Sequence, residues 1–174
     1  MNPTLCGEAD NHDYGIVDKS DIAIKNLKRY QIVTSHLPWH NNLVVIKRVL
    51  ILPGETFRIN HSGNYEIEIK KDGIWTSLDI PFERNLFEYD SEGKIIRQSD
   101  HYYNERTLEK NEYIIAGDNW ISSLDCVSSH KTVTYDDLIG VVIEMQGRCS
   151  YNPETQTIST LKPYATRHFW GVDY

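Results

Sequence analysis

The chain has 174 residues and a formal net charge of −7. This length fits one domain, or a core with a small additional lobe, and allows a sizeable apolar interior. Acidic residues outnumber basic ones by 25 to 18, which disfavours a phosphate backbone as a partner, so no nucleic acid is expected. The longest apolar run, at 43–52, is far too short to span a membrane, and the chain as written is expected to be soluble.

Short runs rich in β-branched and aromatic residues recur between turn signals. In chain order they lie at 14–19, 29–33, 43–52, 56–60, 65–70, 94–98, 112–117, 138–145 and 156–160. No long window repeats its apolar residues with the period of a helix, so helical turns are expected only near 134–138 and 106–110. The sequence therefore predicts a mostly β fold of antiparallel strands.

A change of composition divides the chain. The turn sequences PGE at 53–55 and AGDN at 116–119 each end an apolar run. Between them, residues 60–109 are more polar and richer in loops than the flanking segments. We therefore expect a β core formed by residues 1–59 and 110–174, with a smaller β-rich lobe inserted at 60–109.

The apolar run at 43–52 carries two cations at its centre. On a strand, side chains alternate, so Lys47 shares a face with Val45 and Val49 while Arg48 points to the other face. Arginine stays charged and needs a carboxylate partner, whereas burial favours the neutral form of lysine. A neutral lysine is a general base that can activate a serine hydroxyl. The plainer alternative is a lysine whose amine reaches solvent along the strand.

Three blocks, in order, resemble the type I signal peptidase family. MNPTL followed by DYGIVDK is similar to the family's Ser-Met-x-Pro-Thr-Leu run and the strand after it. IKRVLILPGE is similar to the family's lysine block, and AGDNWISSLD is similar to its Gly-Asp-Asn-x-x-x-Ser-x-Asp block. Each block alone is a weak signal, but the three in this order are specific. The resemblance implies a signal-peptidase-like β core and a serine endopeptidase with a Ser/Lys dyad and no cofactor.

The resemblance also implies roles for individual residues. Lys47 is expected to be the general base, and Ser123 is expected to hydrogen-bond its amine. The side chains expected to support this site are Arg48, which would pair with Asp118, and Asn119 and Asp125. Without the flanking blocks, Ser123 would be interpreted as an ordinary turn hydroxyl that satisfies local backbone groups, and Asp118 and Asn119 as ordinary turn formers.

The substrates implied by the resemblance are signal peptides of exported preproteins, with small side chains near the cut. Shallow apolar pockets suit such side chains. The residues expected to line them are Met1, Leu5, Val45 and Ile46. Core packing explains each of these four residues equally well when it is taken singly.

The family's nucleophilic serine directly precedes the Met that corresponds to Met1. It is expected to lie just before the given chain, together with a membrane anchor, so the chain as given is expected to be inactive. The implied location is the cell membrane, with the catalytic domain on the extracytoplasmic side. The alternative is a non-catalytic homologue that keeps the groove and acts as a peptide-binding or assembly factor.

One departure from the family pattern bears on this choice. Val127 stands where the family has an arginine, so one expected ion pair with the nearby aspartates is missing, which favours the non-catalytic alternative. Retention of Lys47, Ser123 and Asp118 favours the peptidase, because a fold kept only for binding has no use for a desolvated base.

Metal binding is not indicated. His36 and His40 form the best candidate pair, but Pro38 disfavours a regular helix there and no third ligand is evident. Cys6, Cys126 and Cys149 have no metal-type spacing, and their odd number neither demands nor excludes one disulfide.

Overall fold

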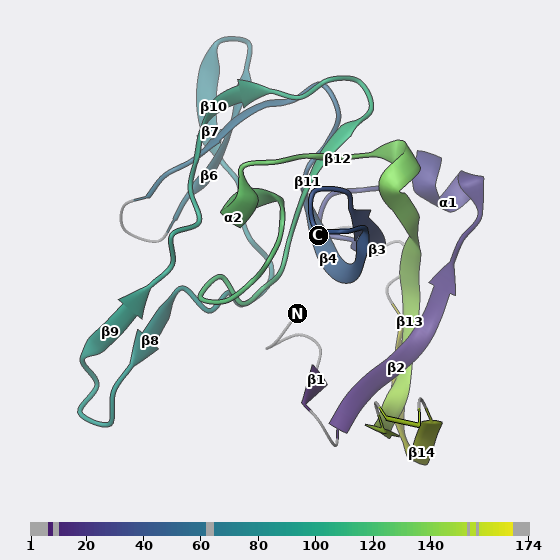
Figure 1. Cartoon of the computed structure of the whole chain (residues 1–174). Coiled ribbons are helices and arrows are strands. Elements are labelled where there is room, and N and C mark those ends of the chain that lie inside the picture. The colour runs from purple at the N-terminus through teal and green to yellow at the C-terminus, as the bar shows by residue number, and fades with distance from the viewer. Residues whose placement is uncertain (1–6, 9–10, 62–64, 153, 156, 169–174) are drawn as a thin grey trace.

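The computed structural model describes residues 7–8, 11–61, 65–152, 154–155 and 157–168. The fold is mostly β and its paired strands run antiparallel, as the sequence predicts (Figure 1). Within the described residues, no helix is both long enough and apolar enough to cross a membrane.

The larger sheet has eight strands, and its hydrogen-bonded neighbours are antiparallel. The order is β1 (Gly7–Glu8), β2 (Asn11–Asp18), β13 (Leu138–Asn152), β3 (Ile32–Leu37), β4 (Leu43–Ile51), β11 (Glu112–Ala116) and β12 (Val133–Thr134), with β14 (Thr157–His168) also paired to β13. Strand β4 therefore lies between β3 and β11 and is hydrogen-bonded on both sides. This position places its middle residues inside the sheet.

The remaining strands form two smaller sheets. A four-stranded sheet has the order β10 (Tyr103–Thr107), β5 (Thr56–Ile59), β6 (Ile67–Lys71) and β7 (Ile74–Ser77), and a ribbon consists of β8 (Phe87–Tyr89) and β9 (Ile95–Gln98). Strands β6 to β10 come from the expected inserted lobe, whereas β5 comes from the segment before it. The division of the chain into a core and an inserted lobe stays a prediction.

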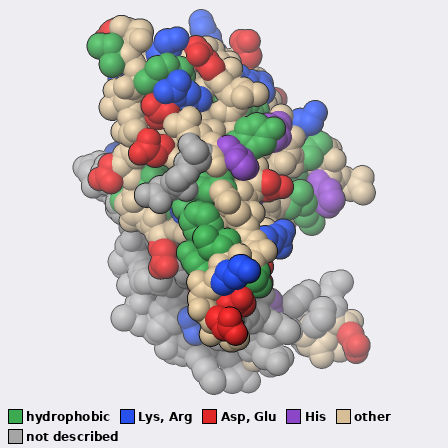
Figure 2. All heavy atoms as spheres, turned by 90° about the vertical axis from the view of Figure 1, so that its left-hand side faces the viewer, with side chains coloured by type: hydrophobic (Ala, Val, Ile, Leu, Met, Phe, Trp, Pro, Cys, Tyr) green, Lys and Arg blue, Asp and Glu red, His purple; other side chains and the backbone are tan. Residues whose placement is uncertain are grey.

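The ribbon of β8 and β9 projects from the body of the molecule at the lower left of Figure 1. It carries apolar side chains that face solvent: Tyr89, Ile95 and Ile96 are all exposed. Figure 2 views the molecule from the side of this ribbon and shows hydrophobic side chains gathered along the middle of that face.

One hydrophobic core joins the two larger sheets. The same cluster of buried side chains contains Val49 and Ile115 from the larger sheet and Phe57 and Ile69 from the smaller one. The four-stranded sheet is therefore packed on the rest of the molecule through apolar contacts.

Helical structure among the described residues is short. The helices are α1 (Asp21–Lys25), α2 (Cys126–Ser129) and the single 3₁₀ turn η1 (Tyr135–Asp137). The turn η1 confirms the helical turn predicted at 134–138. The helical turn predicted near 106–110 is wrong, because Arg106 and Thr107 extend β10 and pair with Phe57 and Thr56 of β5. This pairing with a distant strand overrides the local sequence preference.

Candidate active site

Strand β4 buries its two central cations. Lys47 is 8% exposed and Arg48 is 3% exposed. Their backbones pair with Val33 and Ile32 of β3, and Arg48 also pairs with Ala116 of β11. Because side chains alternate along a strand, the two cations enter different surroundings on the two faces of the sheet.

On one face, the amine of Lys47 meets the hydroxyl of Ser123. The Nζ atom donates a hydrogen bond to Oγ at 3.1 Å. Ser123 lies in the loop between β11 and α2, and β11 is the neighbour of β4 in the sheet. The structure thus brings together the two residues that were predicted to carry the chemistry.

Burial has a direct effect on this amine. Desolvation lowers the pKa of Lys47 below its ordinary value of 10.5, although the nearby carboxylates of Asp125 and Asp118 act in the opposite direction. A lowered pKa increases the fraction of neutral amine, which is the form that can accept a proton.

Gly117 makes room for the contact between Lys47 and Ser123. A Cβ atom at this position would lie 2.4 Å from Oγ of Ser123 and 3.2 Å from Nζ of Lys47. This glycine was not among the site residues predicted from the sequence. Its place in the GDN block was an available signal, but the steric reason depends on where two distant side chains lie.

Asp125 holds the loop that carries Ser123. Its carboxylate accepts hydrogen bonds from the N–H groups of Val127 at 2.9 Å and Ser128 at 3.1 Å, and so caps the first turn of α2. The same carboxylate accepts the N–H of Gly117 at 3.0 Å. Both ends of the loop are therefore tied to one buried side chain.

Several donors keep this buried carboxylate ionised. Burial alone would raise the pKa of Asp125, but the hydrogen bond and charge of His101, the hydroxyl of Ser123 and the N–H of Gly117 more than offset it. The pKa of Asp125 is therefore lowered. His101 was not identified from the sequence, because it lies in the expected inserted lobe, 24 residues before Asp125.

On the other face of β4, Arg48 forms a two-point ion pair with Asp118. Its Nε and Nη2 atoms donate to the two carboxylate oxygens at 3.1 and 2.9 Å. Nη1 donates to the carbonyl of Tyr30 at 2.8 Å, and the ring of Phe82 lies 4.1 Å from the guanidinium carbon. Both charged groups are almost completely buried.

The other predicted site residues lie as follows. Asn119 forms a backbone bridge with Asn85 and is half-buried. Val45 is half-buried, packs against the core and shares the face of Lys47. Ile46 is 43% exposed and lies on the face of Arg48 instead. Met1 and Leu5 fall outside the described residues.

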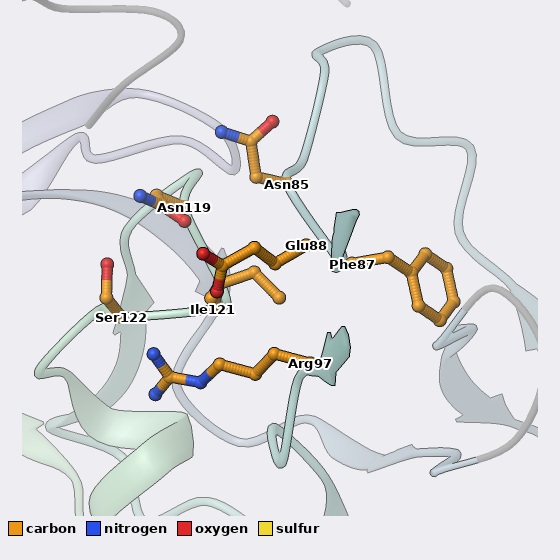
Figure 3. Close-up of a pocket in the computed structure, with 7 residues that line it drawn as sticks. All are labelled: Asn85, Phe87, Glu88, Arg97, Asn119, Ile121 and Ser122. Carbon is orange, nitrogen blue, oxygen red and sulfur yellow. The ribbon is translucent and has the colours of Figure 1, made fainter. Parts of the chain in front are cut away.

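A pocket of about 450 Å³ borders the same loop. Figure 3 shows that the side chains of Glu88 and Arg97 extend from the ribbon toward the loop residues Asn119 and Ser122. The lining residues are Asn85, Phe87, Glu88, Arg97, Asn119, Ile121 and Ser122. No sequence pattern predicts this pocket, since its two walls come from separate parts of the chain.

Where the structure describes them, the cysteines and histidines form no metal cluster. No group of three or more His, Cys, Asp or Glu side chains suited to a metal ion lies among the described residues. Cys126 and Cys149 are buried and unlinked, and burial raises the pKa of the Cys126 thiol. A thiol with a raised pKa is a poor nucleophile at neutral pH. Cys6 lies outside the described residues.

A buried amine in contact with a serine hydroxyl is found in hydrolytic sites where lysine replaces histidine as the base. The family model described as signal peptidase, peptidase S26, matches residues 1–145. The chain therefore belongs to the peptidase S26 family of signal peptidases. No curated protein matches the chain closely enough to serve as a second comparison.

The ion pair of Arg48 and Asp118 is expected to matter strongly for stability. Changing Asp118→Asn should lower the free energy of unfolding by about 3–5 kcal/mol, because it leaves a buried guanidinium without its counter-charge. Urea unfolding measures this loss. The control is Glu105→Gln, whose partner is Lys70 in an exposed ion pair, and which should cost about 0–1 kcal/mol. Equal losses in the two variants would contradict the expectation.

Gly117→Ala is expected to lower the free energy of unfolding by about 1–3 kcal/mol, because the added methyl group enters the space between Lys47 and Ser123. Equilibrium urea unfolding again provides the measurement, with the exposed neighbour Ser122→Ala as the control. A Gly117→Ala protein as stable as the wild type, within about 0.5 kcal/mol, would mean that the site has no such steric requirement.

The lowered pKa of Lys47 predicts a pH-dependent effect on stability. Between that pKa and 10.5 the unfolded chain binds more protons at this position than the folded chain, so burial of Lys47 becomes less costly as pH rises. Lys47→Met should therefore be more stable than wild type near pH 7, and the difference should shrink toward pH 10.5. Urea unfolding over this range tests it, with the exposed Lys71→Met as control. A difference that stays constant with pH would refute the expectation.

Proposed function

We propose that this chain is the catalytic domain of a signal-peptidase-type serine endopeptidase, which removes signal peptides from exported preproteins. The observation that carries the proposal is the buried Nζ of Lys47 at 3.1 Å from Oγ of Ser123. Membership of the signal peptidase family supports the same reaction class.

In the proposed reaction, the nucleophile is a serine placed directly before Met1, as the family resemblance implies. Neutral Lys47 takes the proton of its hydroxyl while the serine oxygen attacks the scissile carbonyl. The backbone N–H of that serine stabilises the oxyanion. Lys47 then returns the proton to the leaving amine, and water hydrolyses the acyl-enzyme.

Ser123 acts as a positioning residue in this scheme. When Lys47 is neutral, donation of one N–H to Ser123 directs the amine, so that its lone pair is free to face the nucleophile. Asp125 keeps the loop of Ser123 in place through Gly117 and the first turn of α2. Arg48 and Asp118 brace β4 and the same loop from the opposite face.

The proposed substrate groove runs along β4 beside Lys47. Val45, half-buried on the Lys47 face, is proposed to contact a small substrate side chain. Met1, Leu5 and Ile46 remain proposed contacts from the family resemblance. The same proposal includes attachment to the membrane surface through a segment before Met1, with the domain on the extracytoplasmic side.

A non-catalytic homologue that binds peptides is the second candidate. The observation that favours it is Val127, which is fully buried at the position where the family has an arginine. Against it stands the burial of Lys47 beside Ser123, since burying an amine lowers stability and binding alone gives no compensating advantage.

Lys47→Ala provides the test, in a chain that carries a serine directly before Met1. Cleavage of a preprotein reporter should fall by at least about 10²–10⁴-fold, because the general base is lost. The exposed Lys71→Ala serves as the control and should cleave normally. Undiminished cleavage by Lys47→Ala would refute the general-base role.

The 174-residue chain without the added serine is expected to cleave nothing. Turnover by that chain, if it is also abolished in Lys47→Ala, would mean that the nucleophile is a residue within the chain. Absence of cleavage even with the serine in place, in a folded protein, would favour the peptide-binding alternative.

A further inference from the structure

A buried histidine from the expected inserted lobe contacts the site. His101 precedes β10 and is 1% exposed. Its Nε2 atom lies 3.3 Å from Oδ2 of Asp125. The family resemblance assigned no role to this residue, and the proposed reaction does not use it.

The imidazole ring is held firmly. It stacks on the buried indole of Trp120, with 5.0 Å between ring centroids and 22° between planes. The backbone N–H of His101 donates to Oγ of Ser99 at 3.1 Å, and the hydroxyl of Tyr65 donates to the carbonyl of Ser99. Ring and backbone are thus both fixed, which is how a side chain that orients another group is usually supported.

The contacts continue from His101 to the lysine. Asp125 lies next to both His101 and Ser123, and Ser123 accepts the hydrogen bond of Lys47. Val127, at the position where an arginine was expected, packs in the core and offers no charge or donor to this carboxylate through its side chain. The side chain of His101, from a different part of the chain, contacts this carboxylate through Nε2.

We propose that His101 is a positioning residue of the lysine site, whose Nε2–H donates to Asp125 and thereby reduces the effect of this carboxylate on Lys47. This inference rests on the proposed function, since it explains how the general base stays neutral. It also makes the segment at 60–109 part of the catalytic apparatus.

The physical reason lies in the charge of Asp125. This carboxylate raises the pKa of Lys47, against the larger effect of burial. The partial positive charge of the Nε2–H, held against Asp125, offsets part of the negative charge that acts on Lys47. Without the donor, we expect Lys47 to hold its proton to higher pH.

Other charged groups surround the ring and its partners. Oδ1 of Asp100, an exposed side chain, lies 3.5 Å from Nδ1 of His101. The guanidinium of Arg84 covers Trp120 at 4.7 Å from the ring centroid. Asp118 and Cys126 act on the charge of Lys47 together with Asp125. Because Asp100, Arg84 and Asp118 are the same in the His101 and His130 variants compared below, their contributions are common to these proteins.

The first test uses the 174-residue chain and does not depend on cleavage. The midpoint of Lys47 titration is followed by the NMR shift of its Cε atom, assigned from the signal lost in Lys47→Met. His101→Leu should raise this midpoint by about one pH unit, which is a tenfold loss of neutral amine at a given pH. His101→Gln, which keeps an N–H donor, should restore most of the wild-type value.

His130→Asn is the matched control. His130 is exposed, contacts Tyr102 edge to face and adopts a left-handed backbone conformation that asparagine tolerates. The His130→Asn substitution should leave the midpoint of the Lys47 titration unchanged. An unchanged midpoint in folded His101→Leu would overturn the proposal. If His101→Leu fails to fold, the imidazole ¹⁵N shifts of the wild-type protein test the proposal instead. A ring without a proton on Nε2 cannot donate to Asp125, and that result would overturn the proposal.

The second test uses the chain with a serine before Met1. The pH at which kcat/KM is half-maximal should rise in His101→Leu by the same amount as the Lys47 midpoint, with activity recovered at high pH. A uniform loss at every pH would indicate a merely structural role and overturn the proposal. A shifted midpoint in a protein that never cleaves would instead overturn the proposed function and leave the coupling of His101 to Lys47 in place.

Discussion

The structure depends on the burial of two adjacent cations on opposite faces of one interior strand. The two buried charges are accommodated in different ways, because a guanidinium cannot lose its proton whereas an ammonium can. Arg48 is neutralised by the carboxylate of Asp118. Lys47 faces the neutral hydroxyl of Ser123, and its burial favours loss of the proton. The same strand thus provides a structural charge on one side and a potential base on the other.

Both partners come from the single loop at 117–125, which follows β11 directly. Because β11 is paired with β4, the start of the loop is held next to the two cations. Asp125 then closes the loop by binding Gly117 at one end and capping α2 at the other. A change in the conformation of this loop would therefore alter the contacts of both Lys47 and Arg48, on the two faces of β4.

The segment at 60–109 contributes to this arrangement and is more than an attached lobe. Phe82 covers the guanidinium of Arg48, and His101 contacts Asp125. Apolar residues of the four-stranded sheet share one core with the larger sheet. Residues from this segment therefore contact both Arg48 and Asp125, so that the properties of the site depend on parts of the chain that lie far apart in sequence.

The sequence by itself determined the mostly β fold and the opposite placement of Lys47 and Arg48, because strand propensity and alternation are properties of consecutive residues. The resemblance to a family supplied Ser123 and Asp118 as partners. Only the tertiary structure decided the contact of His101 with Asp125 and the steric need for Gly117, because such distances arise when separate segments pack together. The same reason explains why the segment after β9 contributes a buried histidine that no local pattern indicates.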